Sequence, residues 1–102
     1  MISISKFAAS VLLRNCKDRK IHAGKIFRLN KRGHRYTVQL DKPKKTDHIM
    51  RYGDSAVLIV DNDIEKEIGN AYINVKEGRT SHNLVMQKNT ITYKITSPVL
   101  LL

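Results

Sequence analysis

The stretch that most constrains the fold is residues 25–40, KIFRLNKRGHRYTVQL. Its second half alternates apolar and polar side chains with a period of two, as in a strand with one buried face. Its first half is a second short run with apolar residues available for burial. The segment between them, residues 30–33 (NKRG), has the composition of a turn. The stretch therefore predicts a β-hairpin with a basic tip.

Further short strands are predicted on both sides of this hairpin. Alternation, or a run of β-branched residues, favours strands at 2–4, 48–52, 56–60, 71–75, 82–86 and 90–96. The most apolar of them, AVLIV at 56–60, is typical of a strand that is covered on both faces. In TITYKIT, residues 90–96, the apolar side is expected to be Ile91, Tyr93 and Ile95.

Two helices are expected. Ser5 is a suitable N-cap for a helix that begins at Lys6. Spacings of four residues give this helix an apolar stripe, formed by Phe7, Ala8, Val11, Leu12 and Cys16. We therefore expect Cys16 to be a core thiol rather than a reactive one. A short second helix at 64–68 follows aspartates that suit its N-terminus and ends at Gly69. Many strands with two helices and no regular alternation predict a β-dominated α+β fold.

A chain of 102 residues provides for one domain. We expect the domain to span residues 1–96, with an apolar tail at 97–102 that packs on the body or forms a small patch for a partner. The single cysteine excludes an internal disulfide and a Cys-rich zinc site. No segment has the pattern of a secretory signal or the apolar length that spans a bilayer. No membrane partner is expected, and the expected location is cytoplasmic.

The net charge of +10 is unevenly distributed. Residues 1–53 contain 14 Lys or Arg against 3 Asp or Glu, whereas residues 54–102 contain 5 against 6. Polarised positive charge favours anionic partners, so an acidic protein or nucleic acid is the expected kind of partner. A solubilising surface is the alternative explanation. Self-association as a homo-oligomer stays open.

Several strings, in their order and spacing, resemble the HesB/IscA-like family, the A-type carriers of iron–sulfur cluster biogenesis. The resemblance covers roughly residues 1–90. It rests on ISISKFAA at the first helix, Gly33 with Tyr36 at the head of an alternating strand, Asp41-Lys42-Pro43, Asp47 before a strand, Val57 to Asp61 before the short helix, and Gly69 through Gly78. The resemblance implies a HesB-like fold: a compact sandwich of mixed short strands with an N-terminal helix and a second short helix.

The resemblance also implies a metal or cluster site of three thiolates, one in a Gly-Cys-x-Gly turn and two in a Cys-Gly-Cys segment near the C-terminus. This sequence departs from the pattern at all three. Without a gap, Lys31 falls at the first cysteine, and a shifted register brings His34 near it. Residues 88–102 contain no Cys and no His. Clusters are held by anionic, soft thiolates. We therefore expect no conventional cluster and no cofactor; iron or an iron–sulfur cluster is implied by the resemblance alone.

The basic hairpin tip is the remaining candidate site. A cluster of cations can bind phosphate, and an aromatic ring beside it can stack on a base. The candidate anion- or nucleic-acid-binding residues are Lys31, Arg32, Arg35, Tyr36, Lys42, Lys44 and Lys45. The last three extend the surface if the two loops lie near one another. A third basic cluster is formed by Lys17, Arg19 and Lys20. A solvated loop is the alternative interpretation.

Three functions remain open at this stage. The first is a non-catalytic relative of the A-type carriers that has lost its cluster ligands and acts as a binding or accessory protein. The second is a small basic nucleic-acid-binding domain. The third is a metal carrier with a non-standard site near His34. The sequence contains no nucleophile elbow and no phosphate-cradling glycine loop, so no enzyme activity is expected.

Overall fold

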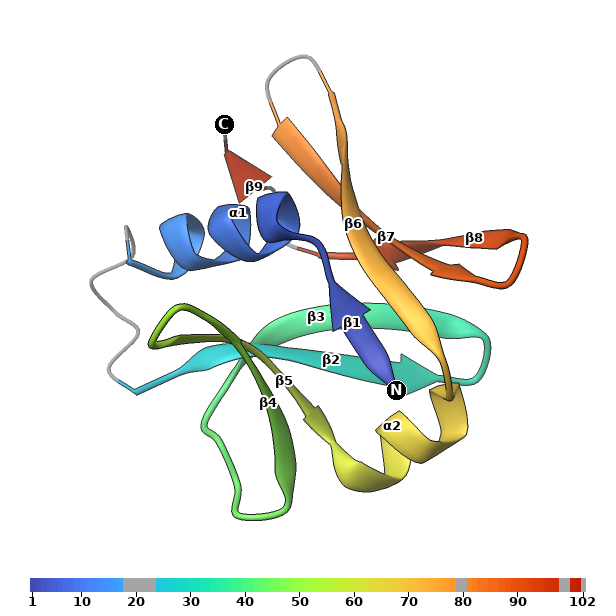
Figure 1. Ribbon diagram of the computed structural model, residues 1–102, viewed down its shortest axis with the longest axis horizontal. Helices are drawn as coiled ribbons and strands as arrows, with labels where there is room; N and C mark the ends of the chain where they lie inside the picture. Colours follow the sequence, from blue (N-terminus) through green and yellow to red (C-terminus); the bar gives the residue numbers. More distant parts are fainter. Residues whose placement is uncertain (18–23, 79–80, 98–99, 102) are drawn as a thin grey trace.

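The computed structural model of the protein describes residues 1–17, 24–78, 81–97 and 100–101 (Figure 1). These residues form nine strands and two helices. In chain order they are β1 (Ile2–Ile4), α1 (Lys6–Lys17), β2 (Ile26–Arg32), β3 (Arg35–Asp41), β4 (Asp47–Tyr52), β5 (Ser55–Asp61), α2 (Asn62–Ile68), β6 (Ala71–Glu77), β7 (Ser81–Lys88), β8 (Ile91–Thr96) and β9 (Leu100–Leu101). Within the described residues, no helix is long and apolar enough to cross a membrane.

The strands form one mixed sheet in the order β1-β6-β7-β8-β3-β2-β5-β4, and β9 pairs with β7. The sheet folds over on itself, so that β6, β7 and β8 form one layer and β2 to β5 the other (Figure 1). The two layers join where β8 pairs in parallel with β3, at Tyr36↔Ile95 and Thr37↔Thr96. This architecture confirms the predicted β-dominated α+β fold with an N-terminal helix and a second short helix.

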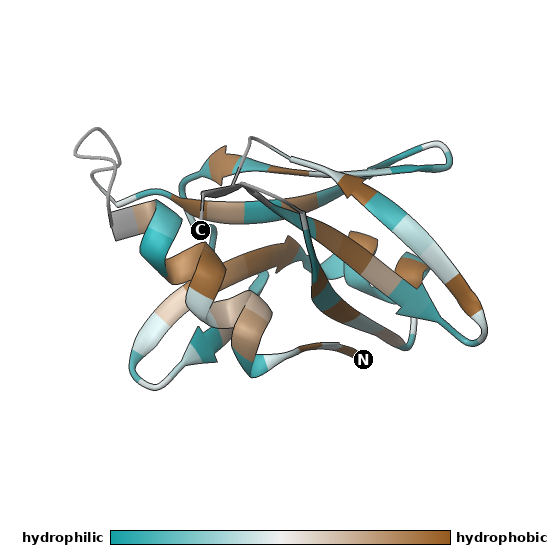
Figure 2. Ribbon diagram, turned by 90° about the horizontal axis from the view of Figure 1, so that it is seen from above, coloured by the Kyte–Doolittle hydropathy of each residue, from teal (hydrophilic) through white to brown (hydrophobic). Residues whose placement is uncertain are grey.

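The core lies between the layers and under α1. The helix packs mainly against β5 and also contacts β4, β6 and β9. Figure 2 shows apolar residues on α1 and on the strands beneath it. The fully buried large side chains include Leu12 of α1, Phe27 and Leu29 of β2, and Leu58 of β5. All four residues from Val57 to Val60 are buried, as expected for a strand covered on both faces.

The start of α1 was predicted correctly with its cap, whereas α2 begins at Asn62, two residues before the predicted helix. The Ala8 amide donates to the Ser5 hydroxyl at 3.0 Å, which satisfies one orphan donor of α1. Asp61 caps α2 in the same way, with its carboxylate accepting from the Asp63 amide at 2.9 Å. Gly69 ends α2 with φ = 74°, a backbone conformation that glycine adopts without steric cost.

Two details of the predicted apolar pattern were wrong. Phe7 is 41% exposed, and its ring meets the edge of His82 at 5.1 Å instead of entering the core. Cys16, by contrast, packs against the core as expected: it is partly buried, its thiol lies 3.4 Å from the Lys25 carbonyl, and burial raises its pKa. Ile91 is 54% exposed because it stands at the end of the β7–β8 hairpin, beyond the opposite layer.

Part of the predicted apolar tail belongs to the sheet. Residues Leu100 and Leu101 form β9, which pairs antiparallel with the start of β7 at His82 and Ser81. Pro98, Val99 and Leu102 lie outside the described residues. Backbone pairing of β9 therefore attaches this segment to the body.

The central hairpin has a tighter turn than predicted. Arg32 pairs directly with Arg35, so the turn consists of Gly33 and His34 alone, and the predicted turn residues Asn30 and Lys31 lie within β2. A two-residue hairpin turn needs a positive φ, which Gly33 supplies with φ = 60°. The strand pairing therefore extends further toward the tip than composition alone indicated.

Candidate functional site

The basic residues of the hairpin tip point to opposite faces of the sheet. Successive residues of a strand alternate between faces. Arg32 and Arg35 are cross-strand partners and are exposed. Lys31 pairs with Tyr36 on the other face, where its Nζ lies 2.8 Å from Oε1 of Glu67 on α2. The structure thus separates Lys31 from the arginines, and His34 is exposed in the turn between them.

Tyr36 belongs to the core. Its side chain is 5% exposed, and its ring lies edge-on to Tyr93 with 5.3 Å between centroids. The expectation that Tyr36 could stack on a nucleic acid base is therefore wrong for this structure. The reason is register, since Tyr36 pairs with buried Ile95 on the inner side of the β3–β8 junction.

The lysines of the second loop lie at the opposite end of the hairpin from the tip. They belong to the connection 42–46 after β3, whereas Gly33 and His34 precede that strand. A strand of this length separates the two loops by about 20 Å. Lys42, Lys44 and Lys45 are exposed, but they do not extend the surface of the tip. Arg19 and Lys20 of the third basic cluster lie outside the described residues, as do His22 and the side chain of Lys17.

The described residues do not provide a metal site. They contain no group of three or more His, Cys, Asp or Glu side chains close enough to hold an ion. Lys31, which falls at the position of the first family cysteine, lies in a strand and pairs with Glu67. The single thiol, Cys16, is on α1. The donor set present therefore does not fit a conventional iron–sulfur cluster, which takes several thiolates.

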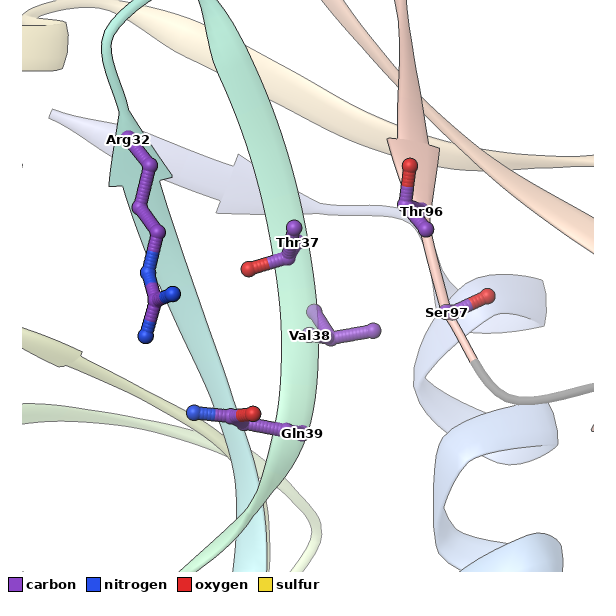
Figure 3. Close-up of a pocket in the computed structure, with 6 residues that line it drawn as sticks. All are labelled: Arg32, Thr37, Val38, Gln39, Thr96 and Ser97. Atoms are coloured by element: carbon purple, nitrogen blue, oxygen red, sulfur yellow. The ribbon is translucent and has the colours of Figure 1, made fainter.

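A surface pocket of about 350 Å³ lies beside the hairpin, where β2, β3 and β8 meet. Its lining residues are Arg32, Thr37, Val38, Gln39, Thr96 and Ser97 (Figure 3). In Figure 3, the Thr37 hydroxyl and the Gln39 amide project to the same side as the Arg32 guanidinium. Arg32 forms no ion pair with any residue that the structure describes. Next to the guanidinium, the pocket therefore offers the Thr37 hydroxyl and the Gln39 amide to an incoming oxyanion, and its lining contains no carboxylate.

Sequence reasoning named Arg32 but missed the rest of this pocket. Thr37 and Gln39 were recognised only as the polar side of an alternating strand. Thr96 and Ser97 are distant in sequence and reach the pocket because β8 pairs in parallel with β3. A parallel pair between strands so far apart in the chain leaves no local signal.

Sequence reasoning also missed a buried ion-pair network at the far end of the hairpin. The side chain of Arg28 is 5% exposed and that of Asp47 is fully buried. Arg28 Nη1 and Nη2 lie 2.7 and 2.6 Å from the two carboxylate oxygens of Asp47, and its Nε lies 2.8 Å from Asp41. Nη2 also donates to the Lys42 carbonyl at 3.1 Å. Arg28 therefore binds both ends of the 42–46 connection, through Asp41 and Lys42 on one side and Asp47 on the other.

This network predicts a loss of stability in acid. Hydrogen bonds from Arg28 hold the pKa of Asp47 below its usual range. The pKa of Asp41 is also lowered, mainly by a hydrogen bond from the Lys42 amide and next by one from Arg28. A carboxylate with a lowered folded-state pKa stabilises the protein above its unfolded pKa, about 3.9, and this contribution is lost as pH falls below that value. We expect the free energy of unfolding, measured with urea, to be level from pH 7 to about 5 and to fall below about pH 4.

The variant Asp47→Asn tests the assignment of this acid dependence. Asparagine resembles protonated aspartate, so wild type and variant should differ most above about pH 5 and converge toward pH 3. A stability difference that stays constant over this range would show that Asp47 does not contribute to the acid transition.

Comparison with known proteins supports the fold. No family model matches the sequence, and no curated protein matches it. Escherichia coli SufA, described as involved in biosynthesis of iron–sulfur clusters, matches in structure with a TM-score of 0.66 and 16% identity, over 88% of this chain and 87% of SufA. A proposed Fe-S biosynthesis protein from Lactobacillus acidophilus matches with a TM-score of 0.53 and 12% identity, over 94% of this chain and 86% of that chain. The chain therefore has the HesB/IscA-like fold that the sequence resemblance predicted.

Proposed function

We propose that this protein is a non-catalytic binding or accessory protein of HesB-like fold, which recognises an anionic group in the Arg32 pocket and carries no conventional cluster. The observation that carries the proposal is the pocket itself. An exposed guanidinium without an ion-pair partner in the described structure lies on the same side of the sheet as the Thr37 hydroxyl and the Gln39 amide. Such groups suit a phosphate or carboxylate oxygen, because charge-assisted hydrogen bonds to an oxyanion are stronger than hydrogen bonds between neutral groups.

The thiol count supports the same proposal. A cluster of either common type takes four cysteine ligands, and this chain has one cysteine. Two copies would bring only two thiols. Cys16 is partly buried, and its raised pKa keeps the thiol protonated, whereas metal binding needs the thiolate. The structural similarity to iron–sulfur biosynthesis proteins favours a role beside such a system, as a binding partner rather than a carrier.

Two measurements on purified protein test this function. Protein prepared anaerobically should contain iron and sulfide far below one per chain and should show no visible absorbance band. Isothermal titration with inorganic phosphate should detect binding that Arg32→Ala abolishes. Arg51→Ala is the matched control because Arg51 is an exposed arginine on β4, away from the pocket lining. Stoichiometric iron, or equal phosphate binding by wild type and R32A, would overturn the proposal.

A further inference from the structure

The Arg32 pocket is part of a larger continuous surface. We define the outward face as the side of β2, β3, β8, β7 and β6 that points away from the core. Its members follow from the strand register, through pairs such as Arg32↔Arg35, Thr37↔Thr96, Val85↔Lys94 and Lys76↔Asn83. The parallel β3–β8 pair joins the two layers, so this face continues across five strands and bends with the sheet between β3 and β8. At a strand spacing of about 4.8 Å, it is roughly 20 Å wide when measured along the sheet.

The outward face is positively charged and almost free of carboxylates. It carries Arg32, Arg35, Lys76 and Lys94, all exposed and none in an ion pair with a described residue. The only carboxylate among its described residues is Asp41, at the end of β3, and Arg28 binds it. The remaining polar side chains are mainly amides and hydroxyls. Positive potential on this face is therefore not cancelled locally.

A second surface pocket, of about 320 Å³, lies on the same face. Its lining residues are Lys76, Asn83, Val85, Thr92 and Lys94. Strand β8 connects the two pockets, because Lys94 lines the second and Thr96 lines the first. Alternate residues of a strand are about 6.8 Å apart, so the pockets follow one another along the sheet. Two consecutive basic pockets suit a ligand with repeated anionic groups.

We propose that the outward face binds single-stranded nucleic acid, with successive phosphates on Arg32, Arg35, Lys94 and Lys76. The proposal rests on the proposed function, since the Arg32 pocket would hold one of the phosphates. Amides such as Asn83, Gln87 and Gln39 offer both donors and acceptors, which base edges use, whereas the carboxylates of an acidic peptide accept hydrogen bonds only. Tyr72, 40% exposed and on the same side of β6, supplies a ring for stacking. The candidate nucleic-acid interface is therefore this outward face. It is no longer the predicted combination of the hairpin tip and the 42–45 loop.

Fluorescence anisotropy with a labelled single-stranded 12-mer tests the proposal. Four phosphate contacts give a salt slope of about −3, so raising KCl from about 50 to 200 mM should weaken binding roughly 50-fold. The double variant K76E/K94E should bind at least about tenfold more weakly, with a salt effect reduced to roughly sevenfold. Lys76 and Lys94 are exposed, so the double variant should fold, which circular dichroism checks.

The matched control is K44E/K45E, which makes the same change in charge on the 42–46 connection and should alter binding less than about threefold. If K76E/K94E and K44E/K45E weakened oligonucleotide binding equally, the proposal would be overturned, since net charge alone would then explain binding. Full displacement of the oligonucleotide by polyglutamate at equal charge would also overturn it, in favour of an acidic protein. Phosphate binding that R32A abolishes, without any oligonucleotide binding, would sink the nucleic-acid proposal and leave the proposed function standing. Oligonucleotide binding without phosphate binding at Arg32 would overturn the proposed function of the Arg32 pocket and leave nucleic-acid binding by the outward face standing.

Discussion

Replacing Arg28 by alanine is expected to lower the free energy of unfolding by about 3–5 kcal/mol. The change removes the only cation bonded to the buried Asp47 carboxylate in the described structure. Asp47 would then still accept a hydrogen bond from the Lys44 amide, at 2.6 Å. A buried charge without a counterion costs several kilocalories, because low-polarity surroundings cannot replace its hydration. A domain of this size is stabilised by only about 5–15 kcal/mol, so the loss should be evident in urea unfolding at pH 7.

Two further variants sharpen this prediction. Arg51→Ala removes an exposed arginine and should change stability by no more than about 0.5 kcal/mol. Arg28→Lys keeps the positive charge but loses the planar fork that binds both oxygens of Asp47, so it should recover only part of the loss. If R28A were no less stable than R51A, the ion-pair network would make no measurable contribution to the free energy of unfolding.

Phe27→Ala is expected to cost about 3–5 kcal/mol through the cavity it leaves. Phe27 is fully buried in β2, where it pairs with Leu40 of β3 and Leu58 of β5. Its ring lies at the centre of one layer, so neighbouring strands cannot collapse into the space without breaking their pairing. Chemical unfolding monitored by circular dichroism measures the loss as a lower midpoint with an unchanged denaturant slope.

The chain contains its own control for this substitution. Its second phenylalanine, Phe7, is 41% exposed and contacts His82 edge-to-face. An aromatic pair of this kind contributes about 0.5–1.5 kcal/mol, so Phe7→Ala should cost about 1 kcal/mol. Similar losses for the two variants would mean that Phe7, as the helical spacing first indicated, is a core residue after all.

The two stability predictions concern adjacent residues on opposite faces of one strand. Phe27 points into the core between the layers, and Arg28 lies under the 42–46 connection on the outward side. Strand β2 is therefore buried on both sides at this end, although its other end carries the exposed Arg32. The stable end of the hairpin holds the strands in register, and the register places Arg32 against Thr37 and Gln39 in the pocket.

Most of the secondary structure could be predicted because its causes are local. Alternation identified β3 and β8, the apolar run identified β5, Ser5 marked the start of α1, and the aspartates after β5 indicated a second helix. Each of these signals depends on residues a few positions apart. The errors were of the same kind: Phe7 and Ile91 fit the local period, but the tertiary structure leaves both side chains exposed.

The candidate site was predicted only in part. Arg32 and Arg35 were named as anion-binding residues, together with Lys31, Tyr36 and the 42–45 lysines, which the structure places on another face, in the core and at the other end of the hairpin. Lys76 and Lys94 were not singled out, because each is an isolated lysine in its strand. Nothing in the sequence around Arg28 distinguishes it from an exposed cation.

The sequence by itself determined the elements, the β-dominated class, the HesB-like resemblance and the absence of the thiolates that a cluster needs. Only the tertiary structure decided which cations share a face and which are neutralised. The physical reason is that burial and charge pairing depend on strand order and register. Here a short parallel contact between β3 and β8, and a loop crossing over Arg28, bring together residues that the chain keeps far apart.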